Sequence, residues 1–302
     1  GFSNPDGKFA KVEGTLSLDE AKPENSKVNV TVSVGSIITG SEKFDNHLLS
    51  FFLTFSFGIL IAPILTHYLY KYKMWKKKAR NEALGGGTTP IFNQLHKEKE
   101  VGTPRMGGIV VWGSVLITIL ALSVLSNIFP SVATQKLNFL SKNQTWLPLF
   151  ALIAASLIGL LDDLLQVRGG GGGYGGGLAL SKRILFVLLI GFIGAYWFYF
   201  KLEVSSIAVP FAGPIEMGIW FIPFFMFTTL AIFSGGVIDG LDGLAGGIMA
   251  VIFSAYGVIA FFQNQIDLAS FCAAIVGGTL AFLWFNIPPA RFYMSETGML
   301  GL

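Results

Sequence analysis

Long apolar runs divide most of this chain into segments of membrane-spanning length. A helix that crosses the hydrocarbon core needs about 20 apolar residues. The segments that meet this requirement are residues 48–70, 107–128, 145–164, 183–200, 217–235, 244–263 and 268–286. Pro63 and Pro148 fall inside two of them, which membrane helices tolerate near kinks and ends. The pattern predicts an all-α polytopic membrane protein, with about seven transmembrane helices in a domain covering residues 48–302.

The first 47 residues follow a different pattern. Apolar and polar residues alternate over residues 28–34 and around Leu16 and Leu18, which predicts half-buried β-strands, and residues 21–26 provide a turn between them. About 50 residues cannot build a substantial core alone, so we expect residues 1–47 to be a short β-rich extramembrane segment. Residues 203–214 predict a second, external hairpin.

Composition agrees with a membrane protein and excludes one class of partner. Of 302 residues, 52% are hydrophobic and only 13% are charged, against about 25% charged in soluble domains. The net charge of +3 is small, which argues against a nucleic-acid partner. The single cysteine, Cys272, lies in an apolar run and is expected to be a packing residue. The chain begins with Gly1 and stops at Leu302, so we expect both ends to be cut.

Lysine and arginine are distributed unevenly between the loops, which predicts the orientation. The 71–106 loop contains nine of them, and the 162–183 loop adds Arg168, Lys182 and Arg183. The alternate loops contain only Lys136, Lys142 and Lys201. The basic loops are therefore expected in the cytoplasm, with the N-terminus outside.

Several carboxylates lie at the edges of the apolar runs, and the orientation places all of them on the cytoplasmic side: Asp162, Asp163, Asp239, Asp242 and Glu296. A carboxylate costs several kcal/mol in hydrocarbon, so ionisable groups at such depth are usually functional. Oxygen ligands that can be shared with phosphate suit Mg²⁺. Adjacent residues on a helix point about 100° apart, so the two neighbouring aspartates can meet different partners. The alternative for each group is a solvated helix end or a helix cap.

Two further segments could line a polar cavity on that side. Residues 102–108 (Gly-Thr-Pro-Arg-Met-Gly-Gly) open the second span, where Thr103 and Pro104 suit a helix start and Arg105 suits a phosphate. Residues 286–298 bend after the last span, and such a break is allowed where it lines a cavity. The alternative for both is an ordinary helix boundary. The glycine-rich residues 169–177 are interpreted as a flexible loop.

These motifs, in this order, resemble the polyprenyl-phosphate sugar-1-phosphate transferase superfamily, and most closely its phospho-N-acetylmuramoyl-pentapeptide transferase branch. The resemblance covers residues 48–302 and rests on residues 102–108, 162–163, 239–243 and 286–298. It implies Mg²⁺-dependent transfer of a phospho-sugar from UDP-N-acetylmuramoyl-pentapeptide to undecaprenyl phosphate, releasing UMP, in the lipid bilayer of a bacterial cytoplasmic membrane. The chain is expected to lack the last spans of that family and its histidine-rich loop. Whether it forms a homodimer is left open.

The resemblance also implies roles for individual residues. Asp162 and Asp163 are the catalytic candidates, which would keep the lipid phosphate deprotonated, and Glu296 takes the metal-ligand position. The substrate-binding candidates are Thr103, Lys99, Asp239, Gly240, Leu241, Asp242, Asn286 and Tyr293.

The sequence departs from the family pattern at several of these positions. Glu296 stands where the family usually has Asp, Gly236 where it has Asn, and Tyr293 where it has Phe. A basic residue is expected at position 100, where this chain has Glu100, so Lys99 is taken as its substitute.

Two alternatives remain open, and the N-terminal segment bears on one of them. Residues 1–50 resemble an internal stretch of the lipocalin-like polyisoprenoid-binding family, carried by Gly-Phe-Ser-Asn at residues 1–4 and Val-Asn-Val-Thr-Val at 28–32. They cover only part of that family's barrel, so lipid binding is not implied. The alternatives are a related transferase that uses UDP-N-acetylglucosamine, and a non-enzymatic protein that binds or organises polyprenyl lipids.

Overall fold

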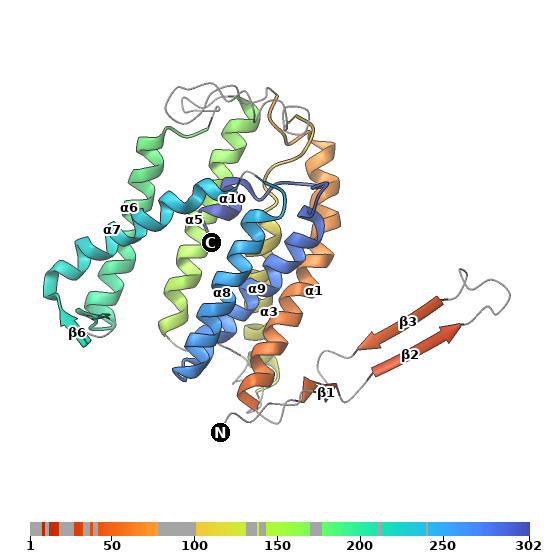
Figure 1. The fold of residues 1–302 in the computed structure, drawn as a ribbon, viewed down its shortest axis with the longest axis horizontal. Helices are drawn as coiled ribbons and strands as arrows, with labels where there is room; N and C mark the ends of the chain where they lie inside the picture. Colours follow the sequence, from red (N-terminus) through yellow and green to blue (C-terminus); the bar gives the residue numbers. More distant parts are fainter. Residues whose placement is uncertain are drawn as a thin grey trace.

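A computed structural model describes residues 8–9, 12–17, 27–32, 37–38, 42–77, 101–130, 138, 143–169, 177–209, 213–239 and 241–302. Long helices dominate it (Figure 1), which confirms the predicted fold class. The α-helices are α1 (Glu42–Lys71), α3 (Ile109–Ile128), α5 (Asn143–Arg168), α6 (Leu180–Tyr196), α7 (Phe221–Ser234), α8 (Leu244–Phe262), α9 (Ile266–Asn286) and α10 (Ser295–Met299). A π-helical turn, η5 (Trp197–Lys201), continues α6, and the 3₁₀ turns η6 (Gly218–Trp220) and η7 (Gly235–Ile238) flank α7.

Six of these helices are long and apolar enough to cross a membrane, and they match the predicted spans closely. They are Leu48–Lys71, Ile109–Ile128, Thr145–Arg168, Leu180–Lys201, Leu244–Phe262 and Ile266–Asn286. The predicted span at 217–235 corresponds to a shorter apolar helix, Gly218–Ser234. At 1.5 Å per residue, its 17 residues extend about 25 Å, somewhat less than the hydrocarbon core. The chain is therefore a multi-pass membrane protein.

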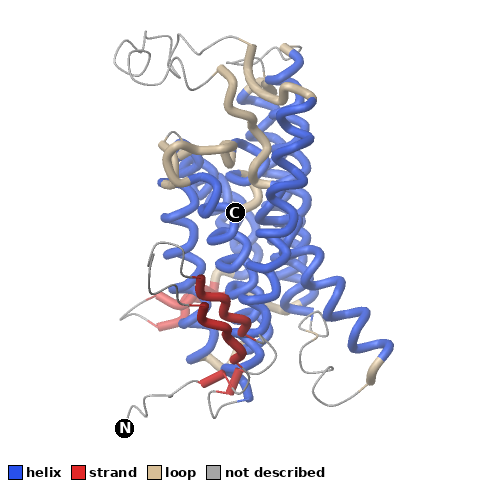
Figure 2. Tube along the Cα trace, turned by 90° about the vertical axis from the view of Figure 1, so that its right-hand side faces the viewer, coloured by secondary structure: helices blue, strands red, loops and turns tan. Residues whose placement is uncertain are grey.

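The strands form three small antiparallel pairs. Strand β2 (Val12–Ser17) pairs with β3 (Lys27–Val32), with Val12 opposite Val32 and Ser17 opposite Lys27. Strand β1 (Lys8–Phe9) pairs with β4 (Ile37–Ile38). The predicted external hairpin is formed by β5 (Ser206–Val209) and β6 (Gly213–Glu216). The predicted strands in residues 1–47 and the predicted hairpin are therefore both present, and Figure 2 shows the strands gathered toward one end of the helical bundle.

Helix α9 is the centre of the bundle and the most buried of the candidate spans, packing against α1, α3 and α8. Small residues allow the close contact with α1. A Cβ atom at Gly277 would lie 2.3 Å from the carbonyl oxygen of Phe51, and one at Gly58 would lie 2.5 Å from the Cβ of Ala281. Within a lipid bilayer the hydrophobic effect does not drive helices together, because lipid tails are as apolar as the side chains. Close backbone packing of this kind therefore supplies much of the free energy of helix association.

The contact at Gly277 predicts a difference between two glycine substitutions. Gly277→Ala forces a methyl group into the Phe51 backbone, and overpacking costs about 1–3 kcal/mol, so the thermal midpoint should fall by at least about 2 °C. Gly247→Ala on α8 is the matched control, because a Cβ there meets nothing within 4 Å and alanine is the better helix former. A thermal scan in detergent checks both. Equal midpoints for the two variants would contradict the packing.

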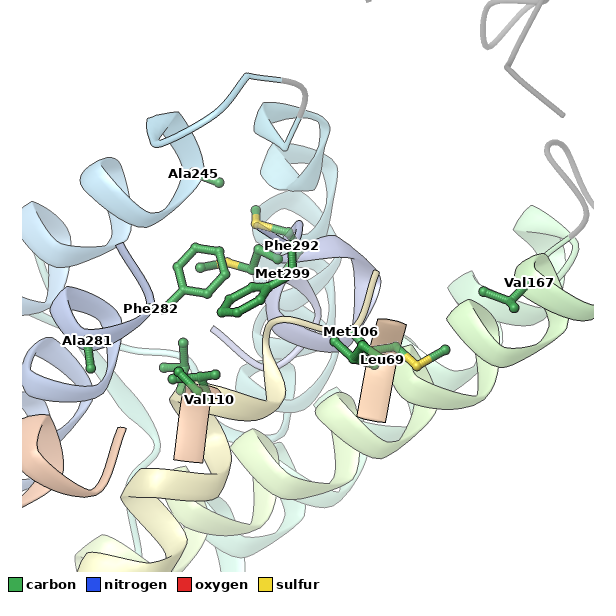
Figure 3. Close-up of a cluster of buried hydrophobic side chains, with 12 residues drawn as sticks. Leu69, Met106, Val110, Val167, Ala245, Ala281, Phe282, Phe292 and Met299 are labelled. Carbon is green, nitrogen blue, oxygen red and sulfur yellow. The ribbon is translucent and has the colours of Figure 1, made fainter. Parts of the chain in front are cut away.

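A hydrophobic cluster connects the end of the bundle that holds α10 to the rest of the core. Figure 3 shows Phe282 of α9, Phe292 and Met299 side by side above Val110 of α3. The ring centroids of Phe282 and Phe292 are 5.7 Å apart, and both rings are fully buried. The segment after α9 is thus anchored by apolar packing, and its polar residues can be held in fixed positions.

Candidate active site

Two of the predicted motifs are joined by backbone hydrogen bonds. The Tyr293 amide donates to the Pro104 carbonyl (2.9 Å), the Gly107 amide donates to the Tyr293 carbonyl (2.8 Å), and the Gly108 amide donates to the Met294 carbonyl (3.2 Å). The 102–108 segment therefore lies against the 293–297 segment, although almost 190 residues separate them in the sequence. These bonds hold the segment with Arg105 next to the segment with Ser295.

Glycines let helix α10 approach α5 closely enough to reach the aspartate pair. A Cβ atom at Gly159 would lie 2.0 Å from the carbonyl oxygen of Glu296, and one at Gly108 would lie 2.2 Å from the Gly298 amide nitrogen. Gly159 precedes Asp162 and Asp163 by three and four residues, so all three lie on neighbouring positions of one helix face. The absence of a side chain at Gly159 therefore brings residues 295–297 onto the carboxylates.

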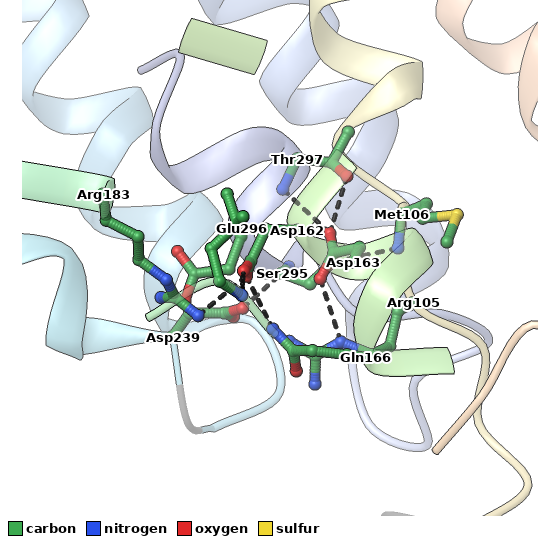
Figure 4. A network of polar contacts seen from close by, with 11 residues as sticks. Arg105, Met106, Asp162, Asp163, Gln166, Arg183, Asp239, Ser295, Glu296 and Thr297 are labelled. Carbon is green, nitrogen blue, oxygen red and sulfur yellow. Dashed lines mark hydrogen bonds and ion pairs between the residues drawn. The ribbon is translucent and has the colours of Figure 1, made fainter. Parts of the chain in front are cut away.

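Asp163 is fully buried and surrounded by donors. Its Oδ2 accepts hydrogen bonds from the Ser295 hydroxyl (2.7 Å), the Thr297 hydroxyl (2.6 Å) and the Thr297 amide (2.9 Å). Its Oδ1 accepts from Nε of Arg105, 3.1 Å away. Figure 4 shows these contacts converging from the second span's entry loop and from α10. Oδ2 is thus occupied by three neutral donors, and Oδ1 is the oxygen that pairs with the positive charge of Arg105.

Asp162 points to a different set of partners, as expected for adjacent helical positions. Its Oδ2 accepts from Gln166 (2.7 Å) and from the guanidinium of Arg183 (2.8 Å), and its Oδ1 accepts from the Leu178 amide. The same guanidinium donates to Oε1 of Glu296 at 2.6 Å. Arg183 therefore bridges Asp162 and Glu296 from the start of α6 (Figure 4).

Asp239 joins the network through a backbone amide. Its Oδ2 accepts from the Ser295 amide at 2.7 Å. Burial raises the pKa of the Asp239 carboxyl, with Arg105 and the Ser295 amide opposing this rise. Burial likewise raises the pKa of the Glu296 carboxyl, against the opposing charge of Arg183. Asp239 follows α7, so this helix leads from the β5–β6 hairpin to the same end of the bundle as α10, despite its shorter length.

The other predicted site residues lie around this network. Asn286 accepts from the Gly243 amide (2.8 Å) and donates to the Phe292 carbonyl (2.8 Å), and Asp242 accepts from the Ala290 amide (3.3 Å). Both thus tie the segment after η7 to the segment after α9. Leu241 is largely exposed, while Thr103 and Tyr293 are half-buried. Lys99 and Gly240 lie outside the described residues.

The structure adds functional candidates that the sequence analysis did not select. In the sequence, both Arg105 and Arg183 contribute to the basic loops that predict the orientation, and Arg105 also suits a phosphate. No sequence pattern distinguishes Gln166, Ser295 or Thr297 as a site residue. Only the arginines could have been selected from the sequence, because buried carboxylates are expected to pair with cationic side chains. Serine, threonine and glutamine carry no comparable pattern in a single sequence.

Within the described residues, no three Asp, Glu, His or Cys side chains are arranged as a metal-binding group. A cation nevertheless lies between two of the carboxylates, because the Arg183 guanidinium contacts both Asp162 and Glu296. The network of Figure 4 contains four carboxyl groups (Asp162, Asp163, Asp239 and Glu296) and two guanidinium groups. The formal charge of this set is therefore −2.

Comparison with known families assigns both parts of the chain. Residues 145–302 match glycosyl transferase family 4, a range that contains all the carboxylates of the network. Residues 1–57 match the YceI-like domain, which agrees with the N-terminal resemblance to polyisoprenoid-binding proteins.

Several individual proteins that are similar to this chain share the same name. A protein of Listeria monocytogenes named phospho-N-acetylmuramoyl-pentapeptide-transferase is 33% identical over 256 residues, covering 84% of this chain and 71% of the relative. Proteins of the same name from Geobacillus (31% identical, 84% and 71% covered) and Chloroflexus aurantiacus (32% identical, 76% and 60% covered) are also similar. The chain therefore belongs to glycosyl transferase family 4 and, within it, to the phospho-N-acetylmuramoyl-pentapeptide-transferase family.

Proposed function

We propose that this protein transfers phospho-N-acetylmuramoyl-pentapeptide from its UDP-linked donor to undecaprenyl phosphate, with Mg²⁺, and releases UMP. The observation that carries the proposal is the network of buried carboxylates and arginines around Asp162, Asp163 and Glu296. It lies in a chain one-third identical to proteins that bear the name of this activity. This reaction is the first membrane step of peptidoglycan precursor synthesis.

The residues of the network fit Mg²⁺ by their chemistry. All four acidic groups offer carboxylate oxygens, the ligands that Mg²⁺ prefers. Together with the two guanidinium groups they carry a formal charge of −2, which a divalent cation would balance. The Arg183 guanidinium already places positive charge between Asp162 and Glu296. We assign Glu296 as the residue that would hold the ion. When bound, Mg²⁺ would neutralise charge on the donor diphosphate.

The reaction itself is a substitution at phosphorus. An oxygen of the lipid phosphate bonds to the sugar-linked phosphorus, the bond from that phosphorus to the bridging oxygen breaks, and UMP leaves with both bonding electrons. Asp162 and Asp163 would keep the lipid phosphate deprotonated, as assigned from the family. Arg105 and Arg183 would face the developing negative charge, where fixed cations are most effective because they need no reorganisation.

One buried donor supports an anionic substrate at this place. Nε of Arg183 is buried and has no hydrogen-bond partner in the part of the chain that the structure describes. A buried donor left unsatisfied costs about 1–3 kcal/mol. A phosphate oxygen bound beside Arg183 would satisfy it, and guanidinium groups match phosphate geometry well.

We also propose that the site faces the cytoplasm and that residues 1–47 lie outside, as the basic loops indicate. With Ser17→Cys, Lys77→Cys and Gln263→Cys introduced singly, a membrane-impermeant thiol reagent on intact cells should label positions 17 and 263 and leave position 77 unlabelled. Lys77 and Gln263 are exposed, and the native Cys272 is buried, so background labelling should be low. Labelling at 77 alone would reverse the orientation.

Donor identity can be tested by binding alone. We expect purified protein with Mg²⁺ to bind UDP-N-acetylmuramoyl-pentapeptide at least about tenfold more tightly than UDP-N-acetylglucosamine, a difference of about 1.4 kcal/mol, measured by isothermal titration calorimetry. The reverse order would favour the related UDP-N-acetylglucosamine transferase. Binding of neither nucleotide would favour a protein that only binds or organises polyprenyl lipids.

A further inference from the structure

Ser295 occupies the point where three parts of the site meet. It is the first residue of α10, is almost completely buried, and directly precedes Glu296. One side faces the 102–108 segment, another faces Asp163 on α5, and its amide faces Asp239 after α7 (Figure 4). No other described residue of the network bonds to all three of these segments.

The hydroxyl and the amide of Ser295 both form hydrogen bonds within the site. The hydroxyl accepts from the Met106 amide at 2.9 Å and donates to Oδ2 of Asp163 at 2.7 Å. A serine hydroxyl has one donor and two acceptor positions, so both bonds exist together. The Ser295 amide donates to Oδ2 of Asp239 at 2.7 Å. Through a single residue, the two carboxylates are set at a fixed separation from each other.

The backbone reaches this arrangement in an unfavourable conformation. Ser295 has φ of 51° and Met106, its partner across the hydrogen bond, has φ of 70°. Both lie in the left-handed region, which costs residues other than glycine roughly 1–2 kcal/mol. Such strain persists where the surroundings determine the conformation, and it is concentrated at functional sites. Glycine would adopt this φ without strain, yet the chain has a serine here. This indicates that the serine side chain has a role that offsets the strain.

We propose that Ser295 is a positioning residue for the transfer reaction, a role that rests on the proposed function. Its hydroxyl holds Oδ2 of Asp163, which leaves Oδ1 facing Arg105. Its hydrogen bond to Met106 keeps Arg105, the preceding residue, against that oxygen. Its amide fixes Asp239. Removing the hydroxyl should leave the carboxylates present but misaligned, and the effect should therefore fall on the chemical step rather than on donor binding.

The pair Ser295→Ala and Ser295→Gly separates the hydroxyl from the backbone strain. Both lose the hydroxyl, but only glycine relieves the strain at positive φ. We expect kcat to fall about 10- to 100-fold in both variants, the range for a lost hydrogen bond to a charged group, with the donor KM changed less than about threefold. The glycine variant should have the higher thermal midpoint without recovering kcat. Ser114→Ala is the control, because Ser114 is equally buried but bonds only within its own helix.

Hydrogen exchange provides a readout that needs no turnover. In both Ser295 variants, amide exchange in the peptide over residues 101–108 should accelerate, since the Met106 amide loses its acceptor, and Ser114→Ala should leave it unchanged. Unchanged exchange in that peptide would overturn the positioning role even if the wild-type protein proved inactive. Recovery of kcat in Ser295→Gly alone would overturn it as well, because backbone strain would then be the cause. An inactive wild type with accelerated exchange in the variants would instead contradict only the proposed function.

Discussion

Asp163→Asn should lower turnover by at least about 10²-fold. Asparagine preserves the size of the side chain but replaces one carboxylate oxygen with an NH₂ group. Both oxygens of Asp163 accept from donors, three on Oδ2 and Arg105 on Oδ1, so the new NH₂ must face a donor in either orientation. The charge beside Arg105 is also lost. Groups that act on developing phosphate charge commonly contribute factors of about 10²–10³.

Steady-state turnover of purified protein, with a thermal scan to confirm folding, measures this effect. Asp267→Asn is the matched control. It makes the same chemical change in the first turn of α9, outside the network and at the opposite end of that helix from Asn286. Its turnover should stay within about twofold of wild type, since a charge in a first helical turn affects stability by only about 0.3–1 kcal/mol. If folded Asp163→Asn turned over at the wild-type rate, Asp163 would have no role in the reaction.

Glu296→Gln should be comparably damaging, at about 10²-fold or more, and Glu296→Asp should retain far more activity. Glutamine keeps the length of the side chain but removes the charge that pairs with Arg183 and that we assign to Mg²⁺. Aspartate, the residue type that the family resemblance predicts at this position, keeps the charge but shortens the side chain by one methylene. The two variants therefore separate charge from reach.

The Mg²⁺ dependence of turnover is the deciding measurement for this pair. Glu296→Gln should need a higher Mg²⁺ concentration for half-maximal rate, whereas Glu296→Asp should stay close to wild type. Glu216→Gln in strand β6 serves as the control, because Glu216 is exposed and contacts Ser205 of the hairpin. Near-normal turnover and Mg²⁺ dependence in Glu296→Gln would remove Glu296 from the metal site.

The helical architecture could be predicted because a single physical rule dominates it. Apolar runs of about 20 residues have few alternatives to spanning helices, and the helix ends agree with the predicted spans within a few residues. The segment at 217–235 differs because Gly218 and Pro223 occupy its start, where the structure has a 3₁₀ turn before α7.

The carboxylates of the site could be selected because charge at the edge of an apolar run is costly. Their partners could not. Arg183 contributes to a basic loop in the sequence, and only folding shows that it bridges Asp162 and Glu296. Gly159 gives no signal as a contact point, because its importance depends on α10 lying against it. Contacts between distant segments depend on packing, which a single sequence does not encode locally.

The most direct test of the account is product formation by the purified protein. With undecaprenyl phosphate, UDP-N-acetylmuramoyl-pentapeptide and Mg²⁺, mass spectrometry of the lipid extract should detect undecaprenyl-diphospho-N-acetylmuramoyl-pentapeptide, with an equal amount of UMP in the aqueous phase. Chelation of Mg²⁺ should abolish both signals, and the Asp163→Asn substitution should lower both by at least about 10²-fold. Folded wild-type protein that forms neither the lipid product nor UMP under these conditions would contradict the transferase assignment.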